Sequence, residues 1–77
     1  MKKDKLLKRI LSSPENIRFG DLVTLVEAYG FQLARVSGSH HIFKHPEKVE
    51  LLNLQNCKGK AKPYQVHQFL RLIGEGF

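Results

Sequence analysis

The chain has 77 residues and a single cysteine, which allow one small domain but exclude a two-domain enzyme, an intramolecular disulfide and a four-cysteine zinc site. Its apolar runs are far shorter than the roughly 20 residues that cross a bilayer, and no apolar segment follows the basic N-terminus as in a signal sequence, so we expect a cytoplasmic protein with no membrane contact. The 13 Lys and Arg outnumber the 7 Asp and Glu, and the net charge of +6 favours a polyanion, nucleic acid before an acidic membrane surface or an acidic protein.

Two helices are expected in the first part of the chain. Residues 3–11 place apolar side chains at helical spacing among basic ones, which predicts a short amphipathic helix before a break at residues 12–16. Residues 20–29 carry an apolar stripe at i, i+3, i+4 and i+7, formed by Leu22, Leu25, Val26 and Tyr29. Asp21 in the first turn and Gly30 after the last stripe residue are typical of the two ends of a helix.

Three strands and a last helix are expected in the second part. Residues 31–37, 40–44 and 49–54 are rich in β-forming side chains and are separated by short turn segments, which predicts an antiparallel meander. Pro63 is typical of the first position of a helix, and the stripe that follows consists of Val66, Phe69, Leu70 and Ile73. Both helix stripes need a surface to bury them, so we expect the helices on one face of the sheet and solvent on the other.

Three of the four histidines lie close together, at residues 40, 41 and 45. On a strand, residues 41 and 45 are about 13 Å apart, too far to share one ion. No carboxylate or second cysteine completes a ligand set, so neither a metal nor another cofactor is expected.

A histidine next to the Gly38-Ser39 corner suits acid–base chemistry on RNA, because imidazole titrates near neutral pH. A base would deprotonate the 2′-hydroxyl, an acid would protonate the leaving 5′-oxygen, and a cation would stabilise the transition state. Passive phosphate binding, or an ordinary role in a turn or strand, fits the same histidines, and residue types alone favour the ordinary role. The pattern also leaves open which of His40 and His41 faces solvent.

Lysines 58, 60 and 62 precede the last helix, at the end where the helix dipole is already partly positive. A phosphate would be attracted by these side chains and by the N–H groups of the first helical turn, whereas the alternative is a solvated loop. Tyr64 is more often a residue at the edge of the core than a platform for a base. Cys57 has no activating neighbour in the sequence and no expected role.

Two segments carry a resemblance to a known family. Residues 38–43 read GSHHIF at the start of the second expected strand, and residues 59–66 read GKAKPYQV. Together with the helix, three-strand, helix order, over residues 18–73, the chain resembles the HicA toxins, also called YcfA-like proteins. The resemblance implies a fold like that of double-stranded-RNA-binding domains and an mRNA interferase, a toxin that cleaves mRNA. It also implies a HicB-type antitoxin as partner and His40 as the catalytic histidine.

We therefore expect residues 1–77 to form a single α+β domain of order α-(α)-β-β-β-α, with residues 1–16 as an extension that departs from the compact family form. The expected function is metal-independent endoribonuclease cleavage of mRNA, with His40 as general base or acid. His41, His45 or Lys44 is the candidate for the second acid or phosphate contact. RNA contacts are expected from Ser39, His41, Lys44, Lys58, Lys60 and Lys62. The alternatives are a non-catalytic RNA-binding module of the same fold and a domain that binds only an acidic protein.

Overall fold

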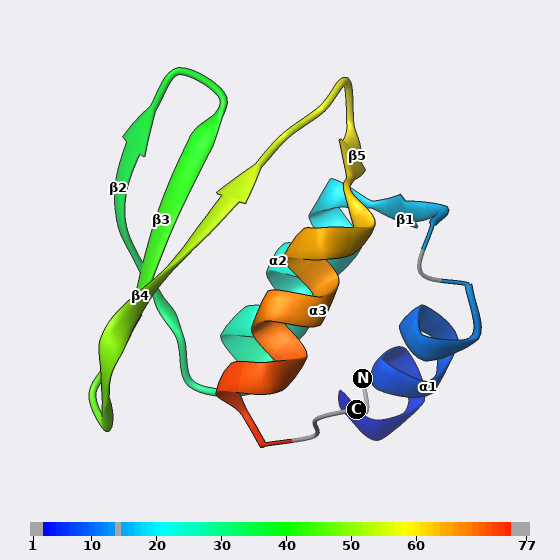
Figure 1. Cartoon of the computed structure of the whole chain (residues 1–77), viewed down its shortest axis with the longest axis horizontal. Helices are drawn as coiled ribbons and strands as arrows, with labels where there is room; N and C mark the ends of the chain where they lie inside the picture. The colour runs from blue at the N-terminus through cyan, green and yellow to red at the C-terminus, as the bar shows by residue number, and fades with distance from the viewer. Residues whose placement is uncertain (1–2, 14, 75–77) are drawn as a thin grey trace.

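The computed structural model describes residues 3–13 and 15–74. In this part of the chain the elements follow one another as shown in Figure 1: α1 (Lys3–Ser12), β1 (Ile17–Arg18), α2 (Phe19–Ala28), β2 (Gln32–Ser37), β3 (His40–His45), β4 (Lys48–Gln55), β5 (Lys60–Ala61) and α3 (Pro63–Leu72). None of the described helices is long and apolar enough to cross a membrane.

The main sheet is antiparallel and has the strand order β2-β3-β4. Its register places His40 opposite Ser37 on one side and opposite Gln55 on the other. Helices α2 and α3 lie on one side of this sheet, and no helix of the part that the structure describes lies on its other side (Figure 1). The expected α+β fold, with helices packed on one face of a three-stranded antiparallel sheet, is confirmed.

The core lies between the two helices and the sheet, and both predicted stripes supply it. Leu22, Leu25 and Val26 of α2 are fully buried, and so are Val66 and Phe69 of α3. Phe43, Leu52 and Leu54 close the core from the sheet. The last residue of each stripe, Tyr29 and Ile73, is only partly buried, because each follows its helix as the C-cap.

Helix α2 begins at Phe19 and ends at Ala28, one residue earlier at each end than the pattern predicts. Gly30 adopts φ +95°, and the N–H groups of Gly30 and Phe31 bond the carbonyls of Glu27 and Val26. These two bonds form a Schellman motif, which satisfies helix carbonyls that have no other partner in the helix. The predicted glycine cap is confirmed, and the motif turns the chain from α2 into β2.

Two short strands were absent from the predicted elements. Strands β1 and β5 pair antiparallel, with Ile17 opposite Ala61 and Arg18 opposite Lys60. Each strand has only two residues, too few for an alternating pattern to be visible in a sequence. The pairing matters for the site, because it brings the segment before α2 against the segment before α3.

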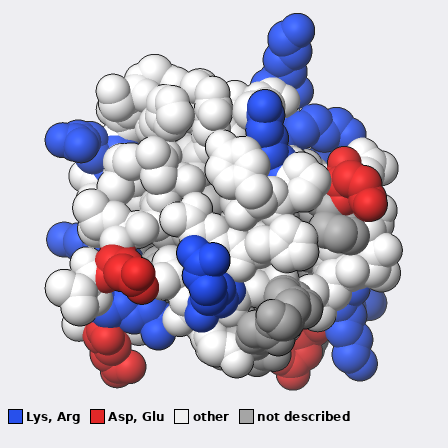
Figure 2. Space-filling model, in the orientation of Figure 1, with Lys and Arg blue, Asp and Glu red and all other residues white. Residues whose placement is uncertain are grey.

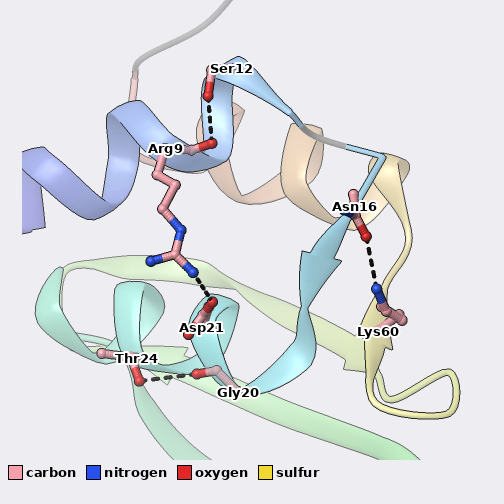
Figure 3. Close-up of polar contacts among 7 residues, drawn as sticks. All are labelled: Arg9, Ser12, Asn16, Gly20, Asp21, Thr24 and Lys60. Carbon is pink, nitrogen blue, oxygen red and sulfur yellow. Dashed lines mark hydrogen bonds and ion pairs between the residues drawn. The ribbon is translucent and has the colours of Figure 1, made fainter.

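Helix α1 packs onto this framework with the predicted amphipathic pattern. Its Leu6, Leu7 and Ile10 are buried, and Ile10 is only 1% exposed. Leu11, which the spacing also places on the apolar side, is 40% exposed instead. An ion pair of 2.7 Å between Arg9 and Asp21 joins α1 to α2 (Figure 3).

Candidate functional site

The Gly38-Ser39 corner is a two-residue hairpin turn between β2 and β3, because Ser37 and His40 are paired directly. Gly38 has φ +62°, and glycine at the first central position is the arrangement of a type II′ turn. The Ser39 carbonyl accepts a hydrogen bond of 2.9 Å from the Asn56 N–H. The turn is thereby fixed to the end of β4, and the start of β3 is fixed with it.

His40 lies on the face of the sheet that carries no helix. Phe43 faces the core, and side chains alternate along a strand, so His40 points away from the helices and is exposed. Its Nδ1 lies 3.2 Å from Oδ1 of Asn53 on β4. An amide oxygen only accepts, so Nδ1 donates this bond, and in the neutral ring Nε2 is the basic nitrogen. The arrangement presents an oriented imidazole that can accept a proton on Nε2.

His41 lies on the opposite face, which settles the alternative that the sequence leaves open. Its half-buried ring packs at 4.9 Å from the ring of Phe19 at the start of α2. Its Nδ1 donates to the Ser39 carbonyl at 3.3 Å. His40 and His41 therefore do not form a pair, because the sheet separates their rings.

His45 is held by main-chain groups on both ring nitrogens. Its Nε2 donates to the Tyr29 carbonyl at 3.1 Å, and its Nδ1 accepts from the Glu47 N–H at 3.0 Å. A Cβ on Gly30 would lie 2.9 Å from Nε2, so this position needs glycine for space as well as for its positive φ. These contacts give His45 a structural role that joins the C-terminal end of α2 to the β3–β4 turn.

The lysines before α3 gather around a second tight turn. Cys57 and Lys60 are bridged, and the residues between them, Lys58 and Gly59, have φ +55° and +85°. Positive φ at both central positions is the type I′ arrangement. Lys58 and Lys60 are exposed beside this turn, and Lys62 is exposed as the N-cap of α3. Figure 2 shows basic side chains gathered at the upper right of that view, over the region of β5.

Hydrogen bonds connect the lysine turn to the hairpin of His40. The side-chain oxygen of Asn56 accepts from the Gly59 N–H at 2.6 Å, and the main-chain N–H of Asn56 donates to the Ser39 carbonyl. Asn56 thus touches both turns, and the lysines lie at the same end of the molecule as His40. Lys44 is on the face of His40 but four residues along β3, which is about 13 Å away.

Gln65 is a buried polar residue whose role the sequence does not reveal. Its side chain is completely buried, accepts from the Gln55 N–H at 3.0 Å and donates to the Gln55 carbonyl at 3.2 Å. An amide that matches both main-chain groups takes the place of a neighbouring strand. Gln65 therefore anchors the residue paired with His40. In the sequence, the only indication of a role for Gln65 is that it lies within residues 59–66, the segment that resembles the HicA toxins.

The sequence does not point to Asn53 either, because only the strand register brings this residue next to His40.

Tyr64 is 59% exposed, so the expectation that it closes the edge of the core is wrong. Its ring lies outside the core because Tyr64 is off the stripe that faces the sheet. Within residues 3–13 and 15–74, no three side chains of the His, Cys, Asp and Glu types cluster as a metal ligand set.

Comparison with known proteins adds to this geometry. No curated protein matches the chain. A family model described as the HicA toxin of bacterial toxin–antitoxin systems matches residues 19–74, from the start of α2 to the glycine after α3. The match includes the His40 hairpin, the lysine turn and Gln65, and leaves out α1. Because it spans most of the 77 residues, the chain belongs to the HicA toxin family.

Proposed function

We propose that this toxin is an endoribonuclease that cleaves mRNA without a metal ion. The observation that carries the proposal is the exposed imidazole of His40, with Nδ1 held by Asn53 and Nε2 open to a substrate. The basic turn at the same end of the molecule and the net charge of +6 support RNA as the substrate. Membership of a toxin family supports the role of the cleavage in arresting growth.

The proposed reaction uses the nucleophile that RNA itself supplies. Nε2 of His40 removes the proton from a 2′-hydroxyl, and the 2′-oxygen attacks the adjacent phosphorus. The bond from phosphorus to the 5′-oxygen breaks, and the leaving oxygen takes a proton from the imidazolium or from water. The products are a 2′,3′-cyclic phosphate and a 5′-hydroxyl, so atoms and charge balance without a metal.

The proposed RNA contacts divide by their position relative to His40. Ser39, Lys58, Lys60 and Lys62 are proposed to hold phosphates of the strand. The ammonium of Lys60 bonds Asn16, so its phosphate is further from the reacting bond than the one held at Ser39. Lys44 is proposed to contact a phosphate further along the same sheet face. His41 lies behind the sheet, so its proposed contact requires the RNA to pass around the hairpin turn.

A HicB-type antitoxin is the proposed partner, and it would act by covering the open sheet face. Leu51 is 57% exposed, and it alternates with the buried Leu52, so it lies on the side of the sheet that has no helix. An apolar side chain on the face of His40 gives a protein partner a surface to bury, while the basic turn favours an acidic rim.

The function is tested by incubating the purified chain with a single-stranded RNA and with DNA of the same sequence, with and without a chelator. We expect cleavage of RNA alone, leaving 2′,3′-cyclic phosphate ends, and no effect of the chelator. RNA binding without cleavage would contradict catalysis and favour the RNA-binding module. No binding at about 0.1 M salt, where weak surface attraction is largely screened, would favour the domain that binds an acidic protein.

Asn53 gives the mechanism a pH signature. In Asn53→Asp a carboxylate would accept the Nδ1 proton of His40 and stabilise the charged ring. Less of the ring would then be available as a base at neutral pH. We expect the acidic limb of the pH–rate profile to move by about 0.5–1 unit to higher pH, since the pair is exposed and partly screened by solvent.

The matched control is Asn56→Asp, which adds the same charge at the same end of the fold and keeps an acceptor for the Gly59 N–H. This variant should leave the position of the acidic limb within about 0.2 unit of the parent, because exposed charges that do not touch the ring are screened. Equal displacement in both variants would show a general charge effect and would remove Asn53 from the mechanism.

A further inference from the structure

Helix α1, which the family match does not include, forms one wall of a pocket. The pocket lies between the C-terminal end of α1, strand β1 and the start of α2, and has a volume of about 480 Å³. Its cationic lining consists of Arg9 from α1, Arg18 from β1 and Lys60 from β5. Arg9 and Arg18 both precede residue 19, where the family match begins.

The walls of this pocket are fixed by packing and by hydrogen bonds. Leu6, Leu7 and Ile10 anchor α1 in the core. Figure 3 shows the guanidinium of Arg9 held at 2.7 Å by Asp21, and the ammonium of Lys60 held at 2.7 Å by the side-chain oxygen of Asn16. The pocket is therefore formed before a ligand arrives, and Arg9 and Lys60 have lost part of their rotamer freedom.

The charge and donor count of the lining favour an anion. Three cations face the pocket against the single carboxylate of Asp21, so the lining keeps a net positive charge. A guanidinium has five N–H donors, and the bond of Arg9 to Asp21 uses one of them. The side chain of Arg18 is exposed and forms no hydrogen bond or ion pair with any residue in the described ranges, although its main chain pairs with Lys60. Planar donor groups of this kind suit the oxygens of phosphate.

We propose that this pocket binds a phosphate group of the RNA strand, at a distance from the bond that is cleaved. The proposal rests on the proposed function. Lys60 belongs both to the lining of the pocket and to the lysine turn, which Asn56 joins to the His40 hairpin. An RNA strand bound at His40 and at the lysine turn is thereby led toward the pocket, and its regularly spaced phosphates match separate cationic sites.

The test measures binding of a labelled 2′-O-methyl RNA of about 12 nucleotides, which lacks the nucleophile and is not cleaved, over about 50 to 200 mM salt. The variants are Arg18→Gln, Arg9→Gln and the two combined in the full chain. The matched control is Lys8→Gln, which removes one exposed charge from α1 outside the pocket. Thermal melts accompany each variant, and Arg18→Gln removes no side-chain hydrogen bond or ion pair among the described residues, so at least one test variant should keep the fold.

Each arginine variant should weaken binding about 3- to 10-fold at the lowest salt and reduce the slope of log K against log salt by about 0.7, the value for one phosphate contact on a single strand. Lys8→Gln should weaken binding less than about 2-fold and leave the slope unchanged. An RNA dinucleotide, whose single internucleotide phosphate cannot occupy the His40 site and the pocket together, should bind the arginine variants and the parent equally. Inorganic phosphate should compete only in the millimolar range, since it occupies one site of the strand.

Several outcomes would overturn the proposal. If the arginine variants lose no more affinity than Lys8→Gln, the pocket does not bind the strand, although cleavage of RNA by the parent would leave the proposed function intact. If the arginine variants bind RNA like the parent but lose affinity for a co-expressed acidic antitoxin, the pocket belongs to a protein interface. If the parent binds no RNA, the proposed function and the pocket proposal both fail.

Discussion

Replacing His40 with alanine should reduce the rate of RNA cleavage by about 10²–10⁴-fold, the usual contribution of one general base or acid. The imidazole is exposed and, among the described residues, forms a single hydrogen bond, to Asn53, so its removal should change the free energy of unfolding by less than about 0.5 kcal/mol. The measurement is the initial cleavage rate on a labelled RNA, together with growth of a bacterium that expresses the variant without an antitoxin. The variant should cleave slowly, arrest growth weakly or not at all, and still bind RNA.

His67→Ala is the matched control, because it removes another exposed imidazole from the side of the molecule formed by α3. It should cleave RNA within about 3-fold of the parent, as expected of a surface substitution away from the site. If His40→Ala arrests growth as strongly as the parent, His40 has no part in the toxicity. If both variants lose activity equally, the loss comes from charge or stability and not from acid–base chemistry.

The helices were predictable because each had a stripe of at least four apolar residues and a recognisable end. The stripe at Leu22, Leu25 and Val26 is an example, since a glycine follows it where the backbone needs positive φ. Strands β1 and β5 could not be predicted, because two residues carry no period. They exist because distant segments are brought together when α2 and α3 pack on the same sheet.

The sequence predicts which segment holds the candidate site, but it does not predict which side chains surround the histidine. The turn residues placed a histidine beside the Gly38-Ser39 corner, and the family resemblance selected His40. Alternation along the strand allowed either His40 or His41 to face solvent, and the register of β3 against the core decided between them. The contacts of Asn53 with His40 and of Gln65 with Gln55 depend on the tertiary structure, since neither residue lies near residue 40 in the sequence.

His45 also differs between the sequence and the fold. The sequence makes it a candidate for the second acid, whereas in the fold its ring joins the end of α2 to the β3–β4 turn. Its two ring nitrogens bond the main chain at Tyr29 and Glu47, and its ring packs edge-on against Phe31 at 4.9 Å. A cluster of histidines in the sequence is therefore divided in space among an exposed ring, a ring packed behind the sheet and a ring that fastens a turn.

Phe69→Ala should have the largest effect on stability. Phe69 is completely buried at the centre of α3, and its ring meets those of Tyr29 at 5.6 Å and Phe31 at 5.9 Å. Truncating a buried phenylalanine costs about 3–5 kcal/mol, which is comparable with the whole stability of a domain this small. We expect a largely unfolded variant at 37 °C, measured by urea or thermal unfolding followed by circular dichroism.

Tyr64→Ala is the control on the same helix, because it removes a ring that is 59% exposed. It should change the free energy of unfolding by less than about 0.5 kcal/mol. Equal destabilisation by the two variants would contradict the packing described for α3. The pair also serves as a reference for the catalytic test, since Phe69→Ala should abolish growth arrest and His40→Ala should weaken or abolish it, for different reasons. Only Phe69→Ala should lose the unfolding transition, so a melting curve separates loss of the fold from loss of the base.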